Sequence, residues 1–102
     1  MDANTFETLS SGKSAKEAFN AACDQARYED GHGGYTGTIA EKHEFTMIDT
    51  VASVVEASKL ADKFINEGDP RVDDKWGPAG CIKITGKAGE TPKFLFFGWA
   101  SS

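Results

Sequence analysis

Histidine is the side chain best suited to general acid–base chemistry near neutral pH, and the 102-residue chain contains two of them. His32 lies in the glycine-rich stretch 31–34, after Glu29 and Asp30. A base at His32 would need a nucleophile, but the sequence contains no Gly-x-Ser-x-Gly motif, and Cys81 could serve only if the fold brought the two together. We therefore assign no catalytic residue, and an enzyme based on His32 is the weakest of three functional hypotheses.

The carboxylates near His32 do not form a recognisable metal site. Asp30 and the aspartates at 73–74 are the nearest candidate ligands, but their spacing matches no known signature. Cys23 and Cys81 do not form a Cys-x-x-Cys pair, and two cysteines alone cannot complete a zinc site. The sequence therefore predicts no metal and no cofactor. The opening residues lack the pattern of a signal peptide, so we expect reduced thiols and a cytoplasmic location.

Two glycine-containing loops are stronger candidates for a binding site. Backbone amides in the loop 31–37 could approach a phosphate or carboxylate, although the loop lacks Gly-Lys-Ser/Thr and leads into a predicted strand, unlike a P-loop or a dinucleotide-binding turn. In the loop 73–80, Trp76 could stack on a planar ligand or simply cover the edge of the core. The alternative for the loop 31–37 is that it binds no ligand and forms a conformationally demanding turn from a helix to a strand. The ligand-binding hypothesis uses His32, Gly34, Tyr35, Gly37, Trp76, Gly77 and Gly80.

Local signals predict the elements that position these loops. Ser14 and Glu17 form a capping box that opens a helix ending near 28–30. Asp49 or Thr50 could cap a second helix, with Ser53 and Glu56 as another candidate capping box, and this helix ends at Gly68. We expect strands at 35–40 and 44–48, paired as a hairpin, and at 80–85 and 93–99. Residues 1–13 are polar, with a loop at 10–12, and no helix or strand is predicted in them.

These elements predict an α+β fold with the order αββαββ in a single domain, 1–102. Two helices would cover one face of a four-stranded, mainly antiparallel sheet. The segments 34–39 and 77–82 share the pattern Gly-x-x-Gly-x-Ile, which suggests an internal duplication with units 14–48 and 53–99. The alternative is two separate hairpin-plus-helix units that meet edge to edge.

The last predicted strand is apolar on both faces. Phe94 and Phe96 lie on one face, and the other carries Leu95, Phe97 and Trp99. Since a two-layer fold covers only one face, the second face predicts a homodimer interface or a partner-docking surface formed by Leu95, Phe97 and Trp99. The alternatives are that N-terminal residues cover this face or that the strand is central and shielded within the chain.

Charge narrows the class of partner. Sixteen acidic and eleven basic residues give a net charge of −5, and the basic residues do not cluster, which disfavours direct binding to nucleic acid. No apolar run is long enough to span a membrane. An acidic surface would suit a basic protein partner, although the same charge also keeps a small domain soluble.

The segments 34–42 and 75–81 resemble small uncharacterised proteins of phages and other prokaryotic mobile elements. No activity is attached to that group, so no site residue carries over. The resemblance implies a cytosolic protein that modulates or inhibits a host machine. Our leading hypothesis is therefore a non-enzymatic protein that acts through protein–protein interaction, and the alternative is a protein that binds a nucleotide-like small ligand at the loops 31–37 and 73–80.

Overall fold

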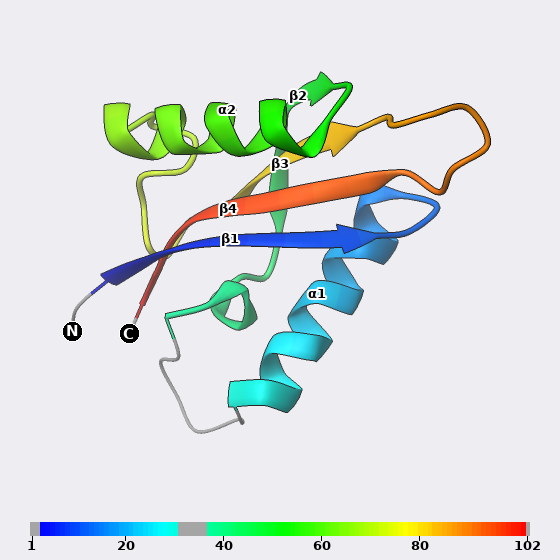
Figure 1. Ribbon diagram of the computed structural model, residues 1–102. Coiled ribbons are helices and arrows are strands. Elements are labelled where there is room, and N and C mark those ends of the chain that lie inside the picture. Colours follow the sequence, from blue (N-terminus) through cyan, green and yellow to red (C-terminus); the bar gives the residue numbers. More distant parts are fainter. Residues whose placement is uncertain (1–2, 31–36, 102) are drawn as a thin grey trace.

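The structure is a computed structural model that describes residues 3–30 and 37–101 of the chain (Figure 1). Two α-helices and four strands follow one another as β1 (Ala3–Ser11), α1 (Ala15–Asp30), β2 (Phe45–Val51), α2 (Val54–Glu67), β3 (Ala79–Ile84) and β4 (Lys93–Ser101), with a short 3₁₀ helix, η1 (Ile39–Glu41), before β2. The α+β class, both helices and the strands β2, β3 and β4 agree with the prediction. Within the described residues, neither helix is long and apolar enough to cross a membrane.

The prediction is wrong at two places near the N-terminus. Residues 3–11, where no strand was predicted, form β1, because this segment pairs along its whole length with β4. The predicted strand at 35–40 begins outside the described residues, and its second half forms η1 instead. The Thr38 side chain accepts a hydrogen bond from the Ala40 N–H, a local turn that competes with an extended strand. The predicted hairpin between 35–40 and 44–48 is therefore absent from the described part of the chain.

The four strands form one mixed sheet with the order β1-β4-β3-β2. β4 is antiparallel to both β1 and β3, whereas β2 is parallel to β3. The sequence predicted a mainly antiparallel sheet. The parallel pair arises because α2 returns the chain from the end of β2 to the start of β3, as a parallel pair requires.

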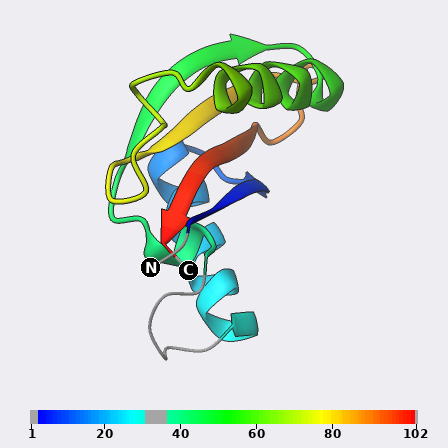
Figure 2. The same cartoon turned by 90° about the vertical axis from the view of Figure 1, so that its left-hand side faces the viewer.

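The helices pack on opposite faces of this sheet, not on one face as predicted (Figures 1 and 2). One buried cluster joins α1 to the side chains of Cys81, Phe94 and Phe96, and a second joins α2 to the alternate strand positions, Ile82 and Leu95 among them. The topology explains the arrangement. The crossovers β1–α1–β2 and β2–α2–β3 run in opposite directions across the sheet, so crossovers of the same hand place their helices on opposite faces.

The proposed duplication is not reflected in the described structure. Ile39 and Ile82 occupy the same position of the shared pattern, but Ile39 lies in η1 and Ile82 in β3. The described residues of the first unit contain α1, η1 and β2, whereas the second unit contains α2 with two strands. Residues that match in the sequence pattern therefore do not occupy equivalent positions in the described structure.

Candidate binding surface at the edge of the sheet

The predicted interface on β4 is covered within the chain. Leu95 and Phe97 are buried beneath α2, where the ring of Phe97 stacks on Phe64 with 6.2 Å between centroids. Trp99 is partly buried. The apolar face that suggested a dimer is thus filled by α2, which agrees with the alternative in which β4 is a central strand shielded from solvent.

The predicted ligand residues fall into two groups. His32, Gly34 and Tyr35 lie outside the described residues. Gly37 has a φ of 71° and donates its N–H to the Ser101 carbonyl at 2.8 Å, so it serves backbone packing at the end of β4. Gly80 lies in β3 against the Phe97 ring, where a Cβ would come within 2.5 Å of Phe97 Cζ. In the described part of the chain, both glycines therefore contact β4.

The loop that carries Trp76 and Gly77 is held by a lysine that the sequence did not single out. The side chain of Lys42 is buried, and its Nζ donates hydrogen bonds to the carbonyls of Asp74 at 3.3 Å, Lys75 at 3.2 Å and Gly77 at 2.8 Å. Burial lowers the pKa of Lys42, and the nearby Asp74 carboxylate acts in the opposite direction. Gly77 therefore has a structural role, whereas Trp76 is 59% exposed.

Neither cysteine is a candidate nucleophile. Both thiols are buried. Burial raises the pKa of Cys81 to about 12, and burial also raises the pKa of Cys23, with Arg27 opposing the change. Within the described residues, no group of three His, Cys, Asp or Glu side chains is placed to hold a metal ion.

The outer edge of β1 is the surface that sequence reasoning missed. β1 pairs with β4 in unbroken register from Ala3↔Ser101 to Ser11↔Lys93, and within the described residues nothing pairs with its other side. An open, regular edge is a template for another strand. The other edge of the sheet, β2, is less suited to pairing because its register shifts between Met47 and Asp49.

The ladder itself shows which backbone groups of β1 are available. Gly12 continues the β1–β4 ladder by donating its N–H to the Pro92 carbonyl at 3.3 Å. In an antiparallel pair, every second residue directs both its N–H and its C=O to the partner. Counting back from Gly12, the backbone groups of Thr5, Glu7 and Leu9 therefore point away from β4, toward the open side.

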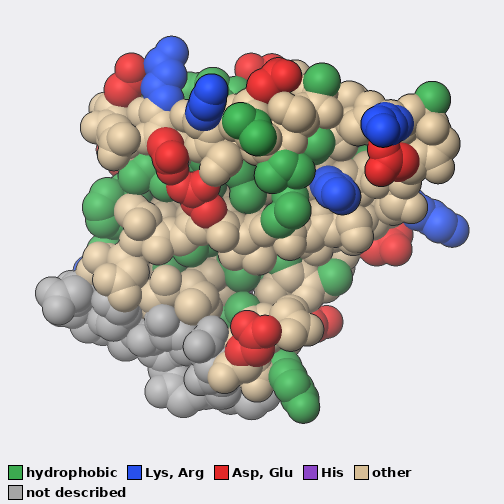
Figure 3. All heavy atoms as spheres, viewed as in Figure 1, with side chains coloured by type: hydrophobic (Ala, Val, Ile, Leu, Met, Phe, Trp, Pro, Cys, Tyr) green, Lys and Arg blue, Asp and Glu red, His purple; other side chains and the backbone are tan. Residues whose placement is uncertain are grey.

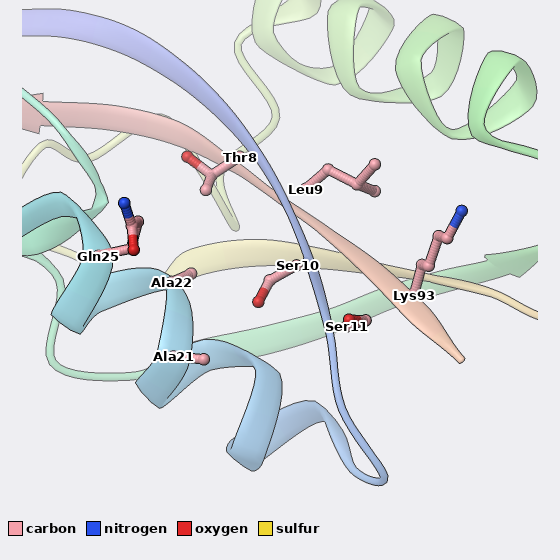
Figure 4. A pocket seen from close by; sticks show the side chains of 8 residues that line it. All are labelled: Thr8, Leu9, Ser10, Ser11, Ala21, Ala22, Gln25 and Lys93. Atoms are coloured by element: carbon pink, nitrogen blue, oxygen red, sulfur yellow. The ribbon is translucent and has the colours of Figure 1, made fainter. Parts of the chain in front are cut away.

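A groove runs along β1 on the side of α1 (Figure 4). Its volume is about 430 Å³, and Thr8 and Ser10 face α1 across it while Leu9 points to the other side of the strand. The wall formed by α1 is low because its side chains there are mostly small. The groove is lined by Thr8, Leu9, Ser10, Ser11, Ala21, Ala22, Gln25 and Lys93.

The opposite side of β1, toward α2, carries an acidic pair. Ser58 Oγ donates a hydrogen bond to Glu7 Oε1 at 3.3 Å, and Asp62, one turn further along α2, carries the carboxylate that acts on Glu7. The pKa of Glu7 is raised to about 7, chiefly by desolvation and then by the neighbouring Asp62 carboxyl, while the Ser58 hydrogen bond acts in the opposite direction. Leu9 and Val55 are 47% and 65% exposed on these same two elements. In Figure 3, hydrophobic side chains gather below α2 with acidic side chains beside them.

Comparison with known proteins does not constrain the function. No protein-family model, no curated protein and no solved structure matches this chain. The candidate site is therefore defined by its geometry: a regular strand edge with outward backbone groups, a groove toward α1 and an acidic pair toward α2.

Proposed function

We propose that this chain is a non-enzymatic binding protein whose β1 edge accepts an extended segment of another protein as an additional strand. The observation that supports this most directly is the open backbone edge of β1 (Ala3–Ser11), which keeps its register over nine residues. Strand addition draws affinity from main-chain hydrogen bonds, and alternate side chains of the added strand give specificity. The groove toward α1 offers such side chains a place to bind.

The resemblance to phage proteins adds a class of partner to this proposal. A chain that caps an extended segment of a host machine would modulate or inhibit that machine without any chemistry of its own. The buried thiols and the absence of a catalytic motif are consistent with a binding role.

The test is a selection of displayed random nonapeptides on the intact protein, followed by amide hydrogen exchange measured by NMR. We expect a bound peptide to slow exchange at Thr5, Glu7 and Leu9. The amides of Phe6 and Thr8 should change little, because they already bond to β4. Peptides that bind without this alternating pattern in β1 would overturn the proposal.

A matched pair of variants separates the backbone edge from its side chains. Leu9→Pro removes an outward N–H, which an edge strand tolerates, so we expect peptide affinity to fall at least about tenfold. Leu9→Val keeps the N–H and the apolar side chain, and its affinity should stay within about threefold of the wild-type value. Thr5→Pro repeats the test at a second position if Leu9→Pro fails to fold. Equal affinity of the wild type and both proline variants would also overturn the proposal.

A small-ligand function is the second candidate, and Trp76 favours it. The indole is 59% exposed, and the Lys75 ammonium lies 5.6 Å from the centre of its ring. A planar ligand that carries a phosphate could stack on Trp76 and meet Lys75. Thermal melting of the wild type and Trp76→Ala with adenosine or guanosine triphosphate tests this idea. A melting temperature that neither nucleotide raises in the wild type would exclude it.

A further inference from the structure

We propose that the segment bound at the β1 edge carries a lysine or arginine directly across from Glu7. This inference rests on the proposed strand addition and specifies its partner. Strand pairing determines the geometry. Residues directly across from each other in neighbouring strands extend their side chains to the same face of the sheet. The residue across from Glu7 therefore enters the side toward α2, next to Asp62.

The acidic pair has no cation of its own in the described part of the chain. The ion pairs there join Arg27 to Asp24 and Arg71 to Asp69, and neither reaches Glu7 or Asp62. The cross-strand neighbour of Glu7 on β4 is Phe97, which is buried and apolar. On α2, the groups that act on Glu7 are the Asp62 carboxyl and the Ser58 hydroxyl. Lysines 59 and 63 flank Asp62 in the sequence and are exposed.

Two carboxyls held together without a cation repel each other, unless they share a proton. A basic side chain from an added strand would relieve this repulsion and would form hydrogen bonds to both groups. An acidic segment would add a third negative charge to the same place. The site therefore discriminates by charge at one position of the bound strand.

Leu9 adds a second feature to the expected pattern. It is 47% exposed and lies two residues from Glu7, so both side chains extend to the same face of β1, the one toward α2. A residue across from Leu9 is expected to be apolar. The bound segment should thus combine a basic residue with an apolar residue two positions away, and the residue between them would face the groove toward α1.

A second copy of this chain fits the site less well. Two β1 strands paired about a twofold axis through Glu7 would oppose one Glu7 to the other, which is destabilising. An axis through Phe6 or Thr8 would place Thr5 or Leu9 across from Glu7 and leave both acidic pairs without a cation. Each copy also has a net charge of −5. A foreign basic segment is therefore the better occupant.

The nonapeptide selection tests this inference when it is repeated on two matched variants. Glu7→Gln with Asp62→Asn removes the acidic pair. Glu44→Gln with Asp73→Asn removes the same charge at exposed positions outside β1 and α2. We expect wild-type and control selections to enrich lysine or arginine at one position of an alternating pattern. The variant without the acidic pair should lose that preference and still bind extended peptides.

The other outcomes are distinguishable. Peptides that protect Thr5, Glu7 and Leu9 but show no basic position would overturn this inference and leave the proposed function intact. Peptides that bind elsewhere would overturn both. A dimer that forms in sedimentation experiments and dissociates in Leu9→Pro would identify a second copy as the occupant and would overturn the inference.

Calorimetry of one selected peptide binding to the protein provides a second test, because it detects protons released on binding. If Glu7 had only a structural role, no proton would be released from it. A cation beside Glu7 favours its charged form, so binding at pH 7 should release a fraction of a proton. The binding enthalpy measured in phosphate and in Tris should then differ for the wild type. It should be the same in both buffers for Glu7→Gln, and equal enthalpies for the wild type would contradict the inference.

Discussion

The contact between Gly80 and Phe97 gives the sharpest test of the packing between the sheet and α2. A Cβ at Gly80 would lie 2.5 Å from Phe97 Cζ and 2.7 Å from both Phe97 Cε1 and Val72 Cγ1. Both neighbours are buried, at 0% and 1% exposure, and Phe97 is stacked on Phe64 of α2. The ring therefore has little room to move away from an added methyl group.

The expected magnitude for Gly80→Ala follows from two opposing effects. Alanine in a strand interior is favoured over glycine by roughly 0.5–1 kcal/mol, because it loses less backbone entropy on folding. Overpacking of a closed core costs about 1–3 kcal/mol, since side chains and backbone must shift. A clash this short belongs at the upper end of that range. We expect the free energy of unfolding to fall by about 1–2 kcal/mol.

The assay is urea unfolding of Gly80→Ala, Phe97→Leu and the double variant. Leucine lacks the far ring atoms that meet the new methyl group, so the double variant should be more stable than the sum of the single changes predicts, by at least about 0.5 kcal/mol. Additive effects would show that residue 80 and the Phe97 ring are not in contact. A Gly80→Ala protein as stable as the wild type would refute the closed packing of β4 under α2, and would revive this face as an interface.

Three further predictions concern single groups. Cys23 and Cys81 should not react with Ellman's reagent at pH 8 in the native protein, and both should react in guanidinium; rapid native reaction would contradict their burial. Lys42→Met should lower the free energy of unfolding in urea by about 1–3 kcal/mol, since three carbonyls lose their donor, and unchanged stability would show that this contact contributes nothing. Because the pKa of Glu7 is raised to about 7, its stabilising contribution is complete below 4.5 and is lost as the pH rises through 7. The melting temperature should therefore fall between pH 5 and pH 8 more in the wild type than in Glu7→Gln, and parallel profiles would contradict the shift.

The parts of the fold that depend on local signals could be predicted from the sequence. Ser14 accepts a hydrogen bond from the Glu17 N–H at 3.2 Å, and Ser53 accepts one from the Glu56 N–H at the same distance. Gly68 ends α2 with a φ of 66°. Caps and helical periodicity act within one or two turns, so they appear in the sequence without knowledge of the tertiary structure.

The strand β1 could not be predicted in this way. Its two large apolar residues, Phe6 and Leu9, are three positions apart and therefore lie on opposite faces, so the segment shows no alternating pattern. Its stability as a strand comes from pairing with β4, at the other end of the chain. Because β1 was not predicted, the crossover from β1 to β2 could not be predicted either. The opposite directions of the two crossovers, which place the helices on opposite faces of the sheet, therefore could not be inferred from the sequence.

The same reasoning explains why the sequence directed the search for a site to β4 rather than to β1. A strand that is apolar on both faces is typical of the interior of a sheet covered on both sides, and β4 has that place here. The strand left with a free edge carries mostly polar residues, and its one aromatic residue, Phe6, is buried in the core and not displayed at the edge. An edge of this kind binds mainly through main-chain N–H and C=O groups, which almost every residue carries. The composition of β1 therefore gives no sign of the proposed strand addition, and the proposal rests instead on the topology of the sheet and on the Glu7–Asp62 pair beside β1.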